Sequence, residues 1–288
     1  MKVLLTGGNG MLGRTISKVF ASYYPHFEVV LTDLPKVDIT DENAIDSVIA
    51  NEKPDVVIHC AATTNVDWCE SHIDDAYNVN AFGSGNVASA CYRHGVRLIA
   101  ISTDYVFDGV SSKPYTEFDK PTDCNNIYGK SKLAGEELIR LLCPNHCICR
   151  VSWLYGFGGP SFVHTMLKLA DSKSVVKVVD DQIGNPTSAI AVAKHLALLL
   201  DRPNLCGTFH LTCEGEATWA EFAREIFRIA GKDVVVEGCS REEFPRLAAR
   251  PKNSRLDKMR LRLACLPPMP DWKEALKLFM KEEFGYGS

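Results

Sequence analysis

Tyr128 and Lys132 are the residues whose types and spacing suggest acid–base chemistry. They stand four positions apart in the run 127–142, which predicts a helix, so both side chains lie on one helix face. The pKa of a free tyrosine is about 10, and a neighbouring ammonium lowers it toward the pH at which an acid–base group works. Thr103 follows the aliphatic run 98–102. It is expected at the carboxyl end of a strand, where its hydroxyl can bond the same reacting oxygen.

The pair by itself is a common pattern on exposed helices, so a cofactor site elsewhere in the chain has to support it. A short apolar strand at the N-terminus leads into Gly7, Gly10 and Gly13, and a helix that begins with Met11 and Leu12 follows. In this context the glycines permit a tight turn, close approach of a pyrophosphate and packing of the helix on the strand. The phosphates then meet the amides at the helix N-terminus. A tight turn without a ligand is the alternative.

Two carboxylates follow the second predicted strand, 28–32. Asp33 can accept hydrogen bonds from an adenosine ribose and would repel a 2′-phosphate, which favours NADH, although nearby Lys36 could offset that charge. Asp38 either bonds the adenine amine or serves only as a turn residue. Ile39 beside it is included among the cofactor contacts. NADPH and NADH therefore both remain open.

Small residues follow the third predicted strand, 54–59, in which His59 only fills a strand position. Ala61, Ala62 and Thr63 allow backbone to lie close to a ligand, here the pyrophosphate and ribose of the cofactor. A long helix is expected over 76–93, with Asn80 reaching toward the catalytic strand, which covers 95–101.

This alternation of strands and helices predicts an α/β fold with a doubly wound, Rossmann-like parallel sheet, which binds ligands at its carboxyl edge. Residues 1–155 are assigned to the dinucleotide-binding core, with roughly 185–205 returning to it. Residues 156–184 and 206–288 are assigned to a smaller C-terminal α/β lobe that binds substrate.

Longer motifs cover nearly the whole chain. They are 37–41, 61–62, 66–67, 102–109, 128–136, 150–153, 181–187 and 250–256. On these motifs the chain resembles the extended short-chain dehydrogenases/reductases and, more narrowly, the dTDP-4-dehydrorhamnose reductase family. The resemblance implies that Thr103, Tyr128 and Lys132 form the catalytic trio.

The resemblance also implies a reaction: NAD(P)H-dependent reduction of the C4 ketone of dTDP-4-dehydro-L-rhamnose to dTDP-L-rhamnose, a step toward cell-surface polysaccharide. Related sugar 4,6-dehydratases carry Asp-Glu after the catalytic threonine. Here Asp104 is followed by Tyr105, so dehydration is disfavoured and carbonyl reduction remains. Thr103, Asp104 and Tyr105 are expected to contact the substrate.

Three further residues are expected to bind the nucleotide sugar. Trp153 follows a predicted strand at the ligand edge and could stack on a sugar face, with a core aromatic as the alternative. Arg250 and Arg255 belong to the strongest basic cluster. Their guanidinium forks suit a diphosphate, and a solvated charged turn is the alternative. The polar turn 180–187 fits scaffolding and substrate contact equally well.

Two positions depart from the family pattern. Some relatives bind Mg²⁺ at a dimer interface through glutamates that align with Thr15 and Ile190, neither of which is a metal ligand here. We therefore expect no metal, and a monomer or weak homodimer. Thr63 stands where the family usually has an aromatic residue or histidine beside the cofactor, which leaves backbone contact intact but puts a ring contact in doubt.

Two other functions compete with this one. The chain could reduce a different nucleotide 4-keto sugar, or it could be a non-catalytic, cofactor-binding regulatory subunit resembling the beta subunit of methionine adenosyltransferase. The intact Thr103, Tyr128 and Lys132, together with Trp153, count against the regulatory subunit.

Composition fits an enzyme with a small-molecule substrate. The chain has 288 residues, 46% of them hydrophobic, and a net charge of −4, which gives no reason to expect nucleic-acid binding. No apolar run is long enough for a membrane span and no signal peptide is evident, so a cytoplasmic protein is expected. Cys143, Cys147 and Cys149 are interpreted as buried thiols, with a metal cluster as the alternative.

Overall fold

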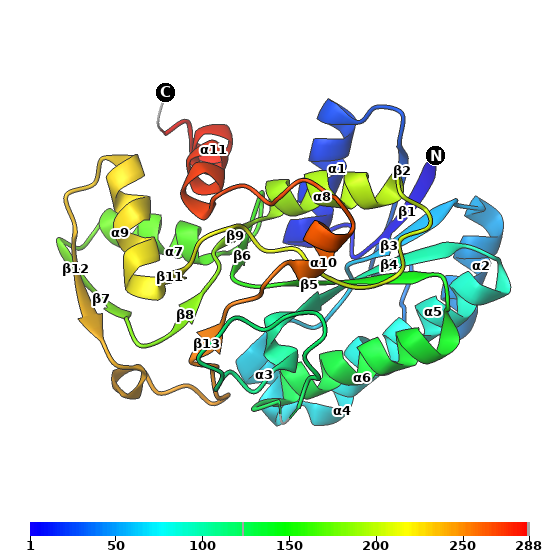
Figure 1. The fold of residues 1–288 in the computed structure, drawn as a ribbon, viewed down its shortest axis with the longest axis horizontal. Helices are drawn as coiled ribbons and strands as arrows, with labels where there is room; N and C mark the ends of the chain where they lie inside the picture. The colour runs from blue at the N-terminus through cyan, green and yellow to red at the C-terminus, as the bar shows by residue number, and fades with distance from the viewer. Residues whose placement is uncertain (123, 287–288) are drawn as a thin grey trace.

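Six parallel strands form the central sheet of the computed structural model, which describes residues 1–122 and 124–286 (Figure 1). The strands are β1 (Lys2–Thr6), β2 (Glu28–Thr32), β3 (Val56–His59), β4 (Arg97–Thr103), β5 (His146–Val151) and β10 (Gly207–His210). Their order across the sheet is β10-β5-β4-β3-β1-β2. The order reverses between β1 and β3, and a doubly wound sheet binds its ligands outside the carboxyl ends at that point. The predicted fold class is confirmed.

Helices cover both faces of this sheet (Figure 1). One face carries α2 (Glu42–Glu52), α5 (Ser84–Arg93) and α6 (Ile127–Leu142), which pack on one another, and the other carries α1 (Met11–Tyr23) and α8 (Ala189–Leu200). The shorter α3 (Val66–Ser71) and α4 (Ile73–Tyr77) pack against α6. Helix α6 has the predicted bounds because the Asn126 side chain caps its N-terminus by accepting from Gly129 N at 2.8 Å.

The predicted helix over 76–93 is not one regular helix. Helix α4 ends at Tyr77, a π-helical turn covers Asn78–Gly83, and α5 begins at Ser84. Such insertions in a helix often occur at functional sites. A period-based prediction misses this turn, since the apolar pattern continues through it.

A smaller α/β part lies beside the sheet, on the left of Figure 1. Its strands pair as β7 (Val175–Val179) with β12 (Val235–Cys239), and as β11 (Ala217–Thr218), β8 (Ile183–Gly184) and β13 (Asn253–Ser254). Its helices are α7 (Phe162–Ala170), α9 (Trp219–Ala230) and α11 (Trp272–Phe284), while α10 (Met259–Leu263) packs against β10 of the central sheet. Two short strands, β6 (Leu154–Tyr155) and β9 (Thr187–Ser188), connect it to the sheet. Helix α9 begins with the predicted capping box of Thr218 and Glu221.

Strand β10 corrects one assignment made from sequence. Residues 206–288 were all given to the smaller lobe, but Gly207–His210 pairs in parallel with β5 at the edge of the central sheet. The chain crosses through α8 before it enters β10, so β5, α8 and β10 have the strand–helix–strand order of a parallel sheet. The other boundaries of the division into core and lobe stay a prediction.

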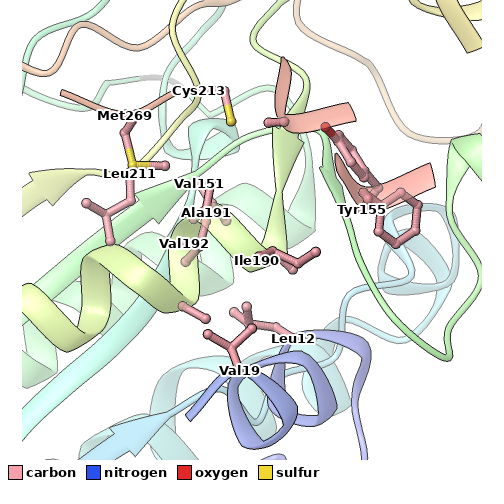
Figure 2. Close-up of a cluster of buried hydrophobic side chains, with 14 of the residues drawn as sticks. Leu12, Val19, Val151, Tyr155, Ile190, Ala191, Val192, Leu211, Cys213 and Met269 are labelled. Atoms are coloured by element: carbon pink, nitrogen blue, oxygen red, sulfur yellow. The ribbon is translucent and has the colours of Figure 1, made fainter. Parts of the chain in front are cut away.

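A buried apolar cluster joins α1, α8 and the start of the smaller part (Figure 2). Leu12 and Val19 of α1 face Ile190 and Val192 of α8, and Tyr155 extends the cluster toward α11. Burial of about 25 cal/mol per Å² of apolar surface makes such a layer the main source of stability. It fixes α1, and with it the glycine loop, relative to the smaller part of the molecule.

The eleven cysteines are all free thiols, and Cys143, Cys147 and Cys149 are buried. Within residues 1–122 and 124–286, no His, Cys, Asp or Glu side chains gather in a group that could hold a metal ion. The same residues include no helix long and apolar enough to cross a membrane.

Candidate active site

The three predicted catalytic residues meet at the carboxyl end of β4. Thr103 is the last residue of β4, and Tyr128 and Lys132 lie in the first two turns of α6. The Thr103 hydroxyl lies near the Tyr128 phenol and donates to Asp104 Oδ1 at 3.1 Å. The Lys132 Nζ atom donates to the carbonyl of Ile101 at 2.9 Å, in the same strand. Strand β4 therefore positions the hydroxyl and anchors the ammonium, while α6 carries the phenol between them.

The pKa values of this trio differ from the simplest expectation. Burial raises the pKa of Tyr128, and the nearby Thr103 hydroxyl opposes that rise. Burial lowers the pKa of Lys132 to about 8, and the Glu136 carboxylate opposes that fall. The expected lowering of the Tyr128 pKa by Lys132 is thus absent in this structure. The physical reason is that the phenol is desolvated while the ammonium is bound to a strand carbonyl.

Asp104 lies buried beside the trio with one oxygen unused. Its Oδ1 accepts from the Thr103 hydroxyl at 3.1 Å, and its Oδ2 is buried without a partner among the described residues. Burial raises the pKa of Asp104 to about 6, and the nearby Ser254 and Thr103 hydroxyls oppose that rise. A buried oxygen without a donor is costly unless a ligand supplies one.

Tyr105 packs its ring edge-on against Tyr128, with 5.6 Å between ring centroids and 71° between planes. The entry into α6 needs Gly129 here, because a Cβ at that position would lie 2.1 Å from the Tyr105 carbonyl oxygen. The close approach brings the first turn of α6 onto the residues that follow β4. It explains why Tyr105 and Tyr128 share one site.

A buried ion-pair network lies one turn beyond Lys132 on α6. Glu136 accepts from Ser102 Oγ at 2.6 Å, from Arg150 Nε and NH2 at 2.9 and 2.7 Å, and from Arg140 NH2 at 2.7 Å. The Arg150 and Glu136 side chains are each only 1% exposed. Burial would raise the pKa of Glu136, but Arg150, Arg140 and Ser102 together lower it to about 2. The network ties α6 to β4 and β5.

Asn80, in the π-helical turn, joins the loop after β3 to α6. Its Oδ1 accepts from Thr63 N at 2.9 Å, and its Nδ2 donates to the Thr63 carbonyl and to Ser131 Oγ, both at 3.0 Å. His59 fills a strand position as expected, with its ring bonded to Thr6 and to Ser84. The contact expected between Asn80 and the catalytic strand is thus made instead with α6 and the loop.

The glycine loop forms a cradle that fits a pyrophosphate. Gly7 has a φ of +69°, and a Cβ there would lie 2.5 Å from Ala61 N, so the loops after β1 and β3 touch. Gly13 would place a Cβ 2.3 Å from the Gly7 carbonyl oxygen. Neither a side-chain cap nor a first-turn acid occupies the N-terminus of α1 in the described structure, which leaves the amides at Met11 and Leu12 available to a ligand. Ala61, Ala62 and Thr63 are half-buried at the same edge.

The two candidate ribose carboxylates have different surroundings. Asp33 accepts from Asn9 N and Leu34 N, both at 2.8 Å, so it lies against the glycine loop where an adenosine ribose would bind. Asp38 is exposed, and its Oδ1 accepts from the amide and hydroxyl of Thr40. This is a local turn, which favours the turn alternative for Asp38. Ile39 is buried in the core under Gly83.

The basic segment lines a cleft of about 560 Å³ between the end of β4 and the smaller part. Arg250 pairs with Asp67 at 3.0 Å, and Arg255 pairs with Glu216 at 3.0 Å. Both guanidinium groups are therefore held in place by carboxylates rather than left in solvent. The residues that line this cleft are Asp108, Gly109, Val110, Ser111, Asn125, Asp181, Ile183, Arg241, Arg250, Lys252, Asn253 and Arg255.

Trp153 lies at the same edge of the sheet, two residues beyond Val151, which pairs in register with Thr103. Its indole stacks on Trp219 of α9, with 3.6 Å between ring centroids and 9° between ring planes. One face of the indole is thus covered by another tryptophan. The predicted stack of Trp153 on a sugar would have to use what remains of the ring.

The comparisons with known proteins agree with this geometry. The model of the RmlD substrate binding domain matches residues 1–284. This chain belongs to the dTDP-4-dehydrorhamnose reductase family, RmlD. A solved dTDP-4-dehydrorhamnose reductase from Clostridium acetobutylicum is 45% identical with a TM-score of 0.93, over 98% of this chain and 99% of that one.

Two further RmlD relatives are similar over nearly their full length. A solved dTDP-4-dehydrorhamnose reductase from Bacillus anthracis, in complex with NADP, is 40% identical with a TM-score of 0.94 and covers 98% of this chain and 99% of that one. A curated dTDP-4-dehydrorhamnose reductase from Aggregatibacter actinomycetemcomitans is 38% identical over 96% of this chain and 97% of that protein.

Sequence reasoning missed several residues of this RmlD site. Ser131 lies within the Tyr-x-x-x-Lys motif, and Glu136 lies one helical turn after Lys132. Their positions on the buried face of α6 could have identified both residues. Ser254, Trp219 and Gly184 come from distant parts of the chain, and no local pattern connects them to β4. Only the packing of the smaller part against the sheet brings them together.

Proposed function

We propose that this chain catalyses the NAD(P)H-dependent reduction of the C4 ketone of dTDP-4-dehydro-L-rhamnose to dTDP-L-rhamnose. The observation that carries the proposal is the placement of Thr103 at the end of β4 and of Tyr128 in the first turn of α6, at the ligand edge of the sheet between the glycine loop and the cleft. Relatives named for this reaction share the fold over nearly the whole chain, and the Bacillus anthracis structure contains NADP.

In this proposal the cofactor supplies the hydride, and side chains of this chain do the rest. The glycine loop holds the pyrophosphate at the start of α1, and Asp33 lies where the adenosine ribose binds. Tyr128 donates its hydroxyl proton to the oxygen that forms from the ketone, and Thr103 hydrogen bonds the same oxygen. Lys132 holds the nicotinamide ribose. Proton donation by a positioned acid contributes about 10²–10⁴-fold to the rate.

The cleft beside Arg250 and Arg255 suits the nucleotide part of the substrate. Positive charge from these residues and from Arg241 and Lys252 faces the cleft, and arginine forks bind phosphate oxygens in pairs. Asp67 and Glu216 hold two of the guanidinium groups, which reduces the side-chain entropy lost on binding. Asp104 Oδ2, which has no donor among the described residues, can accept a hydrogen bond from the sugar.

A spectrophotometric assay of nicotinamide oxidation tests the proposal directly. Purified protein is expected to oxidise NADPH or NADH with dTDP-4-dehydro-L-rhamnose, and Tyr128→Phe is expected to lower kcat by about 10²–10⁴-fold while still binding cofactor. A panel of other nucleotide 4-keto sugars identifies a different substrate if this one fails. Cofactor binding without any turnover, together with co-purification of a protein partner, would favour the regulatory subunit.

We further propose that the chain is a monomer or weak homodimer that works without a metal in the cytoplasm. Thr15 and Ile190, the positions of the dimer-interface glutamates in some relatives, are buried here, so neither side chain is presented to a partner. Eleven free thiols suit a reducing compartment. Light scattering of the eluting protein, with and without Mg²⁺, tests the oligomeric state.

A further inference from the structure

The Trp153 indole has little free surface on either face. Trp219 covers one face in a nearly parallel stack, with only 3.6 Å between ring centroids, so the two rings overlap almost completely. Phe162 packs on Trp219 with 4.7 Å between centroids and extends the aromatic layer into the smaller part. The stack therefore belongs to the packing between β5 and α9, and displacing Trp219 would disturb that packing.

Gly184 of β8 covers the other face. A Cβ at Gly184 would lie 2.5 Å from Cε2 of Trp153 and 2.7 and 2.8 Å from its neighbours Nε1 and Cζ2. If this Cβ lay in the plane of the ring, beside its edge, it would be closer to Nε1 than to Cε2. Because it is closer to Cε2, Gly184 lies over the face of the ring. It must lie opposite Trp219, because the stacked ring fills the other side. Any larger residue at position 184 would push Trp153 out of place.

The edge of the indole is what remains for a ligand. Trp153 is only half-buried, and no acceptor among the described residues bonds its Nε1, whereas Nε1 of Trp219 donates to Gln182 Oε1 at 3.2 Å. Trp153 also has a φ of 46°, which a bulky residue seldom adopts unless its surroundings hold it there. The ring is held in a specific orientation with its N–H unused.

We propose that Trp219 is a positioning residue that holds Trp153 edge-on to the nucleotide sugar, which Trp153 binds by donating from Nε1 rather than by stacking. The inference rests on the proposed function for the identity of the ligand. The β8 strand that supplies Gly184 also contributes Ile183 to the lining of the cleft. Occupation of the cleft and the orientation of Trp153 are thereby linked through one strand.

The stack itself is measured on the protein alone. Two stacked indoles whose transition moments are not parallel give an exciton couplet in the far-ultraviolet circular dichroism spectrum. The couplet is expected in the wild-type protein, absent in Trp153→Phe, Trp219→Phe and Trp219→Leu, and retained in the control Trp272→Phe, which replaces a buried tryptophan outside the stack. A couplet that persists in Trp219→Phe or Trp219→Leu would overturn the inference, because it would come from tryptophans other than this pair.

Binding of dTDP-L-rhamnose in the presence of NADP⁺, measured by calorimetry, tests the role of the edge. Trp153→Phe and Trp219→Leu are each expected to raise Kd about 5-fold or more, as the loss of one hydrogen bond to a ligand does. The double variant is expected to be no weaker than either single one, because both changes remove the same contact. Trp219→Phe keeps an aromatic cover and is expected to restore most of the affinity.

Three results would contradict this inference. Additive losses in the double variant would mean that the two residues act separately. A couplet that disappears when dTDP-L-rhamnose binds would mean that the sugar replaces Trp219 on the ring face. An unchanged Kd in Trp153→Phe would mean that the Trp153 N–H does not bind dTDP-L-rhamnose. Failure of the proposed function is distinct, since it appears as absence of keto-sugar reduction by wild-type protein with the couplet intact.

Discussion

At the scale of single residues, burial and neighbouring charges shift the pKa values of Asp104, Lys132 and Glu136 in different directions. Burial raises the pKa of Asp104 to about 6 and lowers that of Lys132 to about 8, while Arg150 helps to hold Glu136 ionised. The Tyr128 phenol is protonated near neutral pH, because its ordinary pKa of about 10 is already high and burial raises it further. A proton donor must be protonated, and this one is.

The pH dependence of kcat/KM follows from these values. Asp104 is ionised above about pH 6 and Lys132 is charged below about pH 8, so activity is expected to be highest between those limits. It falls on the acid side as Asp104 gains a proton and on the alkaline side as Lys132 loses one. Asp104→Asn is expected to remove the acid limb and leave the alkaline one. A full pH profile of kcat/KM for both proteins measures this. An acid limb that persists in the variant would mean that a group other than Asp104 causes it.

Asp33 offers a test of cofactor preference. Its carboxylate lies on the glycine loop beside the expected adenosine ribose, where it accepts from NADH and repels the 2′-phosphate of NADPH. Asp33→Ser is expected to raise KM for NADH by about 10-fold or more, as the loss of a hydrogen bond to a charged group does, and to leave or lower KM for NADPH. Asp38→Ser is the matched control, since Asp38 lies in a local turn. A larger effect at Asp38 would reverse the two roles.

At the scale of elements, α6 connects catalysis to stability. Its first turns carry Tyr128 and Lys132, and the turn after them carries Glu136, whose network reaches β4 and β5. Because the ion pair between Glu136 and Arg150 is fully buried, removing one partner leaves an uncompensated charge. The helix is therefore fixed to the sheet at the point where its catalytic face needs a defined position.

Glu136→Gln is expected to destabilise the protein by about 3–5 kcal/mol, because Arg150 stays buried without its countercharge. The pKa of Glu136 is about 2 in the folded protein, below the value of about 4.3 for a free glutamate. Its contribution is thus fully present above about pH 5 and is lost as the pH falls toward 2. Urea unfolding at neutral and acid pH measures both effects. Glu137→Gln, at the exposed neighbouring position, is expected to change the free energy of unfolding little.

At the scale of the whole molecule, the sheet and the smaller part each contribute one side of the site. The sheet supplies the glycine loop, Thr103 and α6, and the smaller part supplies Trp219 and, through β13, Ser254. Arg250 pairs with Asp67 at the start of α3, and Asn253 N donates to the Gly109 carbonyl. These contacts cross between segments far apart in the sequence and hold the two sides of the cleft together.

Cofactor binding is expected to stabilise the whole molecule. A ligand at about 100 times its Kd stabilises the folded state by about 2.7 kcal/mol, which for a chain of this size raises Tm by about 5–10 °C. Gly10→Ala tests the cradle. Gly10 has a φ of −71°, which suits alanine, and the added Cβ would lie 3.3 Å from the Gly7 carbonyl oxygen. The apo Tm of the variant is expected to change little, while the rise with NADPH is lost. A full rise in the variant would place the pyrophosphate elsewhere.

Most of the strands and helices, and the residues that follow them, could be predicted from the amino-acid sequence alone. Local hydrogen bonding, apolar period and turn chemistry act over a few residues, so the doubly wound sheet, the bounds of α6 and the meeting of Thr103 with Tyr128 could all be predicted. The tertiary structure alone decided the membership of β10 in the sheet, the π-helical turn at Asn80 and the cover on both faces of Trp153. These features depend on contacts between residues far apart in the chain, and the energies of such contacts leave no pattern in the local sequence.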